Sequence, residues 1–244
     1  MKHKEVSKKR FSKAAVFFIT GVVSLMLTGW VFTGTSTKAK DLRVTNQTKA
    51  FQVEHAEIVG DTLKLTLRNI SEKTINGYVL AFNGGLVQTD YTIGSFTIAP
   101  AEIVETTLPC DPNGSRELEV QAVVFTDRSF DGTVTAAQSI LHRREGIKTQ
   151  LQAIQKLLDK TLESPDNQLA GNLTHLMWQV YSLSEEAEHG RRSHAFRSGL
   201  RDAKSDAHGM LQSLIQESTQ DNNTVRRQRL VELRSQVTTR ANRL

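Results

Sequence analysis

The sequence contains a single cysteine, Cys110, among 244 residues. One cysteine cannot form a disulfide bond within the chain, so an exported domain of this composition must be stabilised by its hydrophobic core alone. We expect Cys110 to be a half-buried small apolar residue; an intermolecular bridge or a reactive thiol is the alternative.

The sequence also lacks the short motifs that accompany common catalytic and phosphate-binding sites. It contains no Gly-rich phosphate loop, no G-x-S-x-G and no H-E-x-x-H, which are the signatures of nucleotide binding, serine hydrolases and zinc proteases. It shows no internal repeat and no low-complexity segment. We therefore predict a protein that is not an enzyme and needs no cofactor.

Residues 14–244 have no net charge, because the formal charge of +5 is fully accounted for by residues 1–13. That segment holds six basic residues and one acid, Glu5. The pI of 9.4 therefore does not indicate a polyanionic partner. Aromatic residues are not interleaved with the basic ones, which also argues against nucleic-acid binding.

The uncharged run Ala14–Phe32 follows this basic flank. As a helix it would be roughly 28 Å long, close to the hydrocarbon thickness of a bilayer. We expect residues 14–34 to be a single-pass anchor in the cell membrane, with residues 1–13 in the cytoplasm and the bulk of the chain extracytoplasmic (periplasmic). The alternative is a signal segment that is cleaved on export. No cysteine stands directly after the run, which excludes a bacterial lipoprotein anchor.

Residues 41–134 carry the two-residue alternation of half-buried strands. Three runs are predicted to present their apolar residues to one face each: Leu63, Leu65 and Leu67; Tyr78, Leu80 and Phe82; Leu118, Val120, Ala122 and Val124. Turn residues recur about every ten positions, which predicts about seven strands in an antiparallel sandwich. The runs Phe51–Ile58 and Thr62–Arg68 should form a hairpin at Gly60-Asp61.

Residues 135–244 change to the period of amphipathic helices. About four helices are expected, with thin apolar stripes that must pack on other helices or on another chain. The region is therefore a small bundle, a set of helical hairpins or an oligomerising coiled coil. The stripes are Ile147, Leu151, Ile154 and Leu158; Leu169, Leu173, Leu176, Val180, Leu183 and Ala187; Phe196, Leu200, Ala203, Ala207, Met210 and Leu214; and Leu230, Leu233, Val237 and Leu244.

The segment Leu63–Phe82, LKLTLRNISEKTINGYVLAF, resembles the early strands of immunoglobulin-like domains in bacterial envelope proteins. The later segment VVFTDRSFDG is similar to a stretch of uncharacterised exported bacterial proteins in which a sandwich precedes a helical tail. The resemblance covers about residues 41–155. It implies an immunoglobulin-like β-sandwich and no particular activity, since a fold does not determine function.

A weak calcium site is suggested by Asp127, Ser129 and Asp131, which occupy the first, third and fifth positions before Gly132, as in a helix–loop–helix calcium loop. The twelfth position is Gln138 and not the bidentate glutamate that such loops need. The favoured alternative is a polar turn that closes the sandwich.

A basic stripe is predicted on one face of the third helix, formed by His194, Arg197, Arg201, Lys204 and His208. Its residues are a possible contact for an acidic partner or anionic lipid headgroups. The alternative is a solvated face or ion pairs within the bundle, with the acids near the end of the second helix, Glu185, Glu186 and Glu188.

The last helix, with six arginines after Thr224, has the same two interpretations. A zinc cluster of Glu185, His189 and His194 fits no ligand spacing.

Together these patterns predict a non-enzymatic, membrane-anchored envelope protein that serves protein–protein interaction or assembly, self-association through the helices included. The alternative is an extracytoplasmic module that binds or senses a small molecule or glycan. An enzyme of unknown type is a third hypothesis, which would need a cleft with convergent polar groups.

Overall fold

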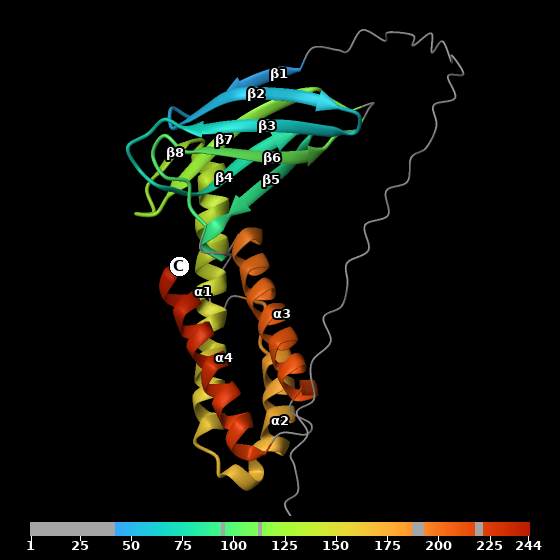
Figure 1. Ribbon diagram of the computed structural model, residues 1–244, viewed down its shortest axis with the longest axis vertical. Coiled ribbons are helices and arrows are strands. Elements are labelled where there is room, and N and C mark those ends of the chain that lie inside the picture. Colours follow the sequence, from blue (N-terminus) through green and yellow to red (C-terminus); the bar gives the residue numbers. More distant parts are fainter. Residues whose placement is uncertain (1–41, 94–95, 112–113, 187–192, 218–221) are drawn as a thin grey trace, which may run out of the picture. The chain divides into compact units, whose positions relative to one another are not determined.

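The described part of the chain has an α+β architecture in which two β-sheets are followed by four α-helices, as the sequence predicts (Figure 1). The computed structural model describes residues 42–93, 96–111, 114–186, 193–217 and 222–244. The predicted membrane segment and its basic flank lie outside these residues. No helix within the described part of the chain is long and apolar enough to cross a bilayer.

Among the residues that the structure describes, eight strands form the two sheets. The five-stranded sheet has the order β1-β7-β4-β5, with β8 also paired to β7, and the three-stranded sheet has the order β2-β3-β6. The strands are β1 (Arg43–Asn46), β2 (Phe51–Val59), β3 (Thr62–Asn69), β4 (Ile75–Phe82), β5 (Gly85–Asp90), β6 (Ile103–Pro109), β7 (Glu117–Phe125) and β8 (Phe130–Gly132).

The predicted hairpin at Gly60-Asp61 is confirmed, because β2 and β3 pair antiparallel up to Val59 and Thr62. Gly60 has a φ of +64°, which a two-residue hairpin turn requires and glycine adopts without strain. Apolar side chains of both sheets meet in one core, in which Leu63, Leu65 and Leu67 of β3 lie with Tyr78 and other residues of β4 and β7.

The prediction of a wholly antiparallel sandwich is wrong at β1, which pairs parallel with β7. Arg43–Asn46 lie beside Glu117–Val120, and β8 pairs with the following residues of β7 on the same edge. β1 has only four residues, all exposed. It therefore carries no alternation from which its direction could be predicted.

The prediction that Leu118, Val120, Ala122 and Val124 share a face is also wrong. Leu118 and Val120 lie in the core between the sheets, whereas Ala122 and Val124 face helix α1 (Val134–Leu162). The cause is a β-bulge in β7. The adjacent residues Val79 and Leu80 of β4 pair with Ala122 and Val120, so Gln121 is an extra residue on β7. Because of it, the residues of β7 after Gln121 point to the opposite sheet face from the one that a regular alternation predicts.

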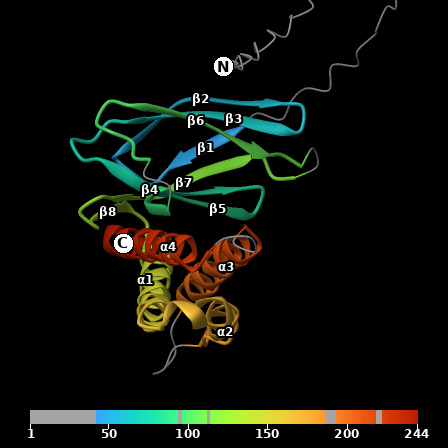
Figure 2. The same cartoon turned by 60° about the horizontal axis from the view of Figure 1, so that its bottom comes forward.

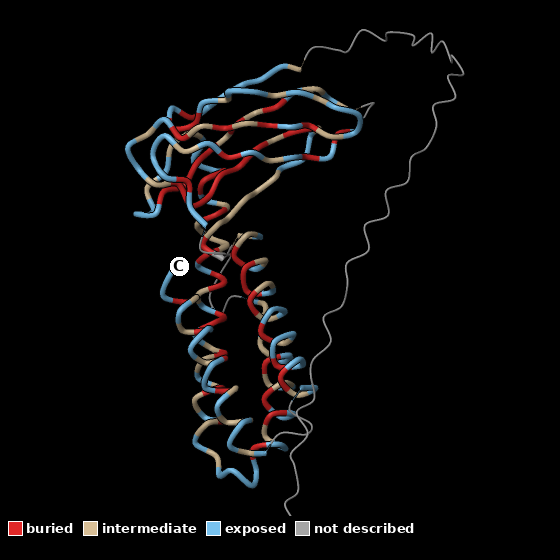
Figure 3. Tube along the Cα trace, viewed as in Figure 1, coloured by how far each residue is buried: buried red, intermediate tan, exposed pale blue. Residues whose placement is uncertain are grey.

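The helical region contains α1, α2 (Leu169–Tyr181), α3 (His194–Glu217) and α4 (Asn223–Arg243), with a short 3₁₀ turn, η2 (Asp166–Gln168), before α2. Figure 3 shows their buried residues as stripes along the helices. The predicted stripes are buried, with exceptions at Leu183, which is half-buried, and Met210, which is exposed while Leu211 takes the buried position. Ala187 lies outside the described residues.

Helix α1 belongs to both halves of the fold. Its first turns, with Ala136, Ala137 and Ile140, pack on the outer face of the five-stranded sheet against Val79. Its later turns pack on α2, α3 and α4. Figure 2 shows the resulting layers: the three-stranded sheet, the five-stranded sheet, then the helices.

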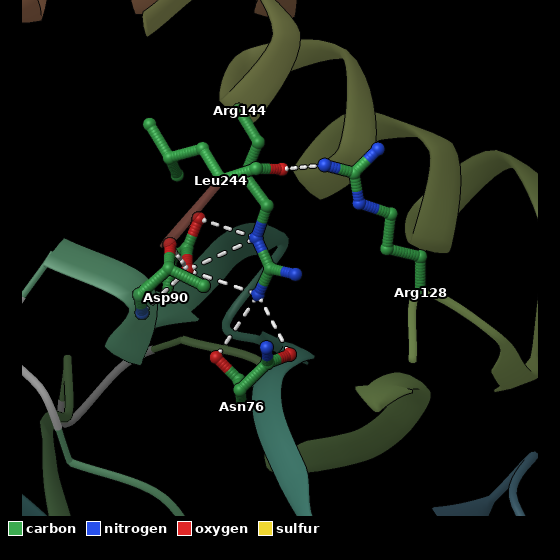
Figure 4. A network of polar contacts seen from close by, with 6 residues as sticks. Asn76, Asp90, Arg128, Arg144 and Leu244 are labelled. Atoms are coloured by element: carbon green, nitrogen blue, oxygen red, sulfur yellow. Dashed lines mark hydrogen bonds and ion pairs between the residues drawn. The ribbon is translucent and has the colours of Figure 1, made fainter. Parts of the chain in front are cut away.

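A buried ion pair joins α1 to the five-stranded sheet (Figure 4). The side chains of Arg144 and Asp90 are 4% and 0% exposed. The Arg144 guanidinium donates to both Asp90 carboxylate oxygens, with its Nε at 3.1 and 3.2 Å, and its Nη2 also donates to the main-chain and side-chain oxygens of Asn76 at 3.0 and 2.9 Å. Asp90 further accepts from the amide and hydroxyl of Thr92. The carboxylate is thus satisfied by donors from two elements, as a buried charge requires.

Two further contacts fix the helices. A β-carbon placed on Gly146 of α1 would lie 2.1 Å from the carbonyl oxygen of Phe196, and one on Gly199 of α3 would lie 2.1 Å from that of Arg143. The two helix backbones therefore touch at a pair of glycines.

At the end of α4, the carbonyl oxygen of Leu244 accepts a hydrogen bond from the Arg128 guanidinium in the β7–β8 turn (Figure 4).

Candidate functional site

Two large aromatic side chains, Trp178 and Tyr181, stand exposed on α2. Each is 59% exposed, and their rings meet edge to face with centroids 6.0 Å apart. Trp178 lies two residues from both Leu176 and Val180 of the buried stripe. At about 100° per residue, this spacing directs it away from the core.

Helix α3 brings cationic side chains to the same surface. The Lys204 ammonium lies 5.7 Å from the Tyr181 ring centroid, and the His208 ring centroid lies 5.8 Å from that of Tyr181. Arg201 precedes Lys204 by three residues and His208 follows it by four, so all three occupy one helix face. We call the surface formed by Trp178, Tyr181, Arg201, Lys204 and His208 the α2–α3 surface.

One carboxylate, Glu185, links the cations of this surface. Its two oxygens lie 2.5 Å from Lys204 Nζ and 3.0 Å from Arg201 Nε. Lys204 also donates to the carbonyl oxygen of Leu183 at 3.3 Å. The hydrogen bonds from Lys204 and then Arg201 hold the pKa of the Glu185 carboxyl below its usual range.

A depression of about 330 Å³ lies among these groups. Its walls combine an aromatic ring, a hydroxyl and charges of both signs, contributed by Tyr181, Glu185, Arg201, Lys204, Ser205 and His208. Such a surface can receive an acidic or hydrogen-bonding group beside an apolar contact.

The predicted basic stripe is therefore divided. Arg201, Lys204 and His208 converge on the depression, whereas His194 and Arg197 are exposed near the start of α3 and do not line it. The predicted ion pairing within the bundle is present at Glu185.

His189 and Glu188 lie outside the described residues, and the described residues hold no group of three or more His, Cys, Asp or Glu side chains that could bind a metal ion.

The calcium-loop residues face different partners. Asp127 accepts from Lys73 Nζ at 2.8 Å and from the Ser129 amide at 2.9 Å, and the lysine hydrogen bond leads the contacts that lower its pKa. Asp131 instead accepts from the amides of Lys49 and Ala50, at 2.6 and 2.8 Å. The two carboxylates thus tie separate loops to the sandwich edge, and Ser129 Oγ is held by Lys73 and Asp127.

The arginines of α4 make ion pairs with neighbouring elements. Arg234 pairs with Asp159 of α1, Arg227 with Asp166 of η2, and Arg229 and Arg240 with α3. These contacts match the interpretation of the last helix as a packed member of the bundle. Cys110 is a free thiol that is buried in the core, 4% exposed, and not half-buried as predicted.

The β region has a depression of its own, of about 390 Å³. Its lining is mainly charged and polar, with Arg43, Glu117 and Glu119 on its rim, and its one aromatic residue, Phe82, is buried. It is not the aromatic-lined pocket that a glycan or small-molecule site in the sandwich would favour.

Sequence reasoning missed Trp178 and Tyr181. The available signal is their helical phase: both are large aromatics placed off the buried stripe of α2, and Trp178 lies on the opposite side of the helix. A bulky aromatic that a helix directs to solvent is a better candidate for contact than one in the stripe.

No protein-family model, no curated protein and no solved structure matches the chain.

Proposed function

We propose that this is a non-enzymatic, membrane-anchored envelope protein that binds a protein partner, or a second copy of itself, through the α2–α3 surface. The anchor is the Ala14–Phe32 segment, with the N-terminus in the cytoplasm and the bulk extracytoplasmic. Support for this topology comes from the basic flank and the length of the apolar run.

The observation that carries the proposal is the exposed pair Trp178 and Tyr181 beside Arg201 and Lys204. Tryptophan, tyrosine and arginine are the residue types that dominate binding energy at protein interfaces. Both residues remain 59% exposed despite their ring contacts within the chain, and covering them with a partner gains the hydrophobic term.

We also propose that the β region is of the immunoglobulin type. The support is strand order: β2-β3-β6 corresponds to the A-B-E sheet and β4-β7-β8 to the C-F-G strands of that fold. In this arrangement the β region is a rigid platform, and the Arg144–Asp90 pair couples the helices to it.

The test compares two double variants of the full-length protein in native membranes. Trp178→Ala with Tyr181→Ala removes the exposed aromatics of α2, and Val225→Ala with Val231→Ala removes two exposed apolar residues of α4 as a matched control. Affinity purification with quantitative mass spectrometry should show partners that are lost only with the first pair. Light scattering of the solubilised protein identifies a second copy as the partner. Equal recovery from both variants, with an unchanged oligomeric state, contradicts the proposal.

A further inference from the structure

Strand β5 forms one edge of the five-stranded sheet and pairs with β4 (Figure 2). The pairing runs without a register shift along all six residues of β5. The turn between the two strands is Asn83-Gly84, with φ values of 53° and 73°. These are the positive values that a tight two-residue hairpin turn requires. β5 is therefore a regular edge strand.

Three residues of β5 direct main-chain N–H and C=O groups to its outer edge: Leu86, Gln88 and Asp90. The first residue of the strand, Gly85, closes the two-residue turn, and a closing residue exchanges hydrogen bonds with the facing strand. Bonded and non-bonded residues then alternate along an antiparallel strand, so the even-numbered residues point away from β4. In the part of the chain that the structure describes, no hydrogen bond occupies their outward main-chain groups.

β5 lacks the features that protect the other sheet edges. Edge strands usually carry charges, prolines or bulges, or are very short, because a bare edge can pair with another strand. β2 carries Glu54 and Glu57 and has a register shift, and β6 carries Glu105 and ends at Pro109. β1 and β8 have four and three residues. The first five residues of β5 are uncharged, and the strand has neither a proline nor a bulge.

Leu86 is the most exposed large apolar side chain that the structure describes, at 69%. It lies on the sheet face that α1 covers further along the strand. There, Gln88 Oε1 accepts from the Ser139 hydroxyl of α1 at 3.5 Å, and Asp90 pairs with Arg144. Helix α1 thus covers the end of β5 but not its beginning. An antiparallel copy of the same strand would bring its covered end to the uncovered one.

We infer that β5 pairs antiparallel with β5 of a second copy of this chain, which joins the two five-stranded sheets across a two-fold axis at Gln88. In this register Gln88 faces Gln88 of the other copy, and Leu86 faces Asp90. All three outward-directed residues then exchange main-chain hydrogen bonds. Each Leu86 side chain comes beside α1 of the other copy and leaves the solvent, and no like charges are opposed.

The side chain of Gln88 also suits pairing with the same residue. Its Nε2 is buried without a hydrogen-bond partner among the described residues. The β-carbons of directly opposite residues lie about 5 Å apart, so an outward turn of the terminal amide brings the two Gln88 groups into hydrogen-bonding reach. A carboxamide carries both a donor and an acceptor, and the same side chain can therefore serve on both strands.

This interface is separate from the α2–α3 surface and does not rest on the function proposed for it. The experiment measures the mass of the full-length protein in detergent by size-exclusion chromatography with light scattering, over a range of protein concentrations. We expect a dimer in equilibrium with the monomer. Trp178→Ala with Tyr181→Ala should leave the dimer intact, so that loss of the α2–α3 contact and loss of this interface can be distinguished.

Two matched variants test the edge itself. Leu86→Glu places a carboxylate opposite Asp90 of the other copy and should raise the dimer Kd by at least about tenfold. Ile103→Glu makes the same change at an exposed apolar residue of the edge strand β6 and should leave the Kd unchanged.

A third variant removes one main-chain donor. Gln88→Pro deletes an outward N–H that β4 does not use, which an edge strand tolerates, and should abolish the dimer. If this variant does not fold, Leu86→Glu decides alone. Residue-resolved amide exchange gives a direct readout: the amides of Leu86, Gln88 and Asp90 should be protected in the dimer and exchange faster in Leu86→Glu.

Four results overturn the inference: a protein that stays monomeric at every concentration, a dimer with the same Kd in Leu86→Glu, a dimer that Trp178→Ala with Tyr181→Ala dissociates, or a dimer in which the amides of Leu86 and Gln88 exchange without protection.

Discussion

The Arg144 guanidinium on α1 and the Asp90 carboxylate at the end of β5 form an ion pair that is almost wholly removed from solvent. The adjacent residue, Arg143, also forms an ion pair, in which its guanidinium lies 2.8 Å from the Asp202 carboxylate. Both of these side chains are about a quarter to a third exposed. The two neighbouring arginines thus offer a buried and a surface ion pair on one helix.

Arg144→Ala should lower the free energy of unfolding by about 3–5 kcal/mol, because it leaves the Asp90 carboxylate buried without its charge partner. Arg143→Ala should cost at most about 1 kcal/mol, as expected for a surface pair. Urea denaturation followed by circular dichroism measures both. Equal losses would show that α1 is not held to the sheet by the buried pair.

Gly146→Ala should destabilise the protein by about 1–3 kcal/mol, since the new methyl group would overlap the Phe196 carbonyl and force α1 and α3 apart. Gly209→Ala should instead stabilise by about 0.5–1 kcal/mol, because its methyl group meets nothing and alanine favours the helix. Thermal unfolding of the two variants checks the opposite signs. Stabilisation by both would contradict the close helix contact.

The link between Glu185 and α3 should be lost in acid. Its pKa is lowered in the folded state, so its stabilising contribution is present above the ordinary carboxyl value of 4.5 and is lost as the pH falls through the lowered value. Carboxyl-carbon NMR titration measures this pKa. We expect Lys204→Met to bring it back towards 4.5, and Lys160→Gln to leave it unchanged.

Calcium at millimolar concentration should not raise the melting temperature. Asp131 is occupied by two backbone amides and Asp127 by Lys73 and Ser129, so a cation would have to break these contacts to gather the carboxylates. Differential scanning calorimetry with calcium or magnesium is the measurement. A calcium-specific rise of about 2–4 °C, equivalent to roughly 1 kcal/mol for a chain of this size, would restore the calcium site.

The architecture could be predicted where local pattern and tertiary packing agree. The Gly60-Asp61 hairpin and most helical stripes are examples, because turn residues and the apolar period can both be recognised within a short stretch of the sequence. The bulge at Gln121 could not be predicted, because one inserted residue reverses the faces of β7 without changing its apolar content. The parallel pairing of β1 depends on a strand more than seventy residues away.

The candidate site could be predicted only in part. The spacing on α3 placed Arg201, Lys204 and His208 on one face. It could not show which of the five stripe residues form ion pairs with Glu185, which are Arg201 and Lys204. Arg144 lies between Ile140 and Ile147 in the buried face of α1. Its partner, Asp90, is remote in the sequence, so only the fold reveals why a charge occupies that stripe.

The central claim, that the α2–α3 surface is the contact for a protein partner, is tested most directly by photo-crosslinking in intact cells. p-Benzoylphenylalanine would replace Trp178, which is 59% exposed, or, as an exposed control, Val231 of α4, which is 49% exposed. The account predicts a discrete crosslinked species of defined mass from position 178 that is absent from position 231 and is lost when Arg201→Glu and Lys204→Glu are added. The same crosslinks from both positions, or none from position 178, would contradict it.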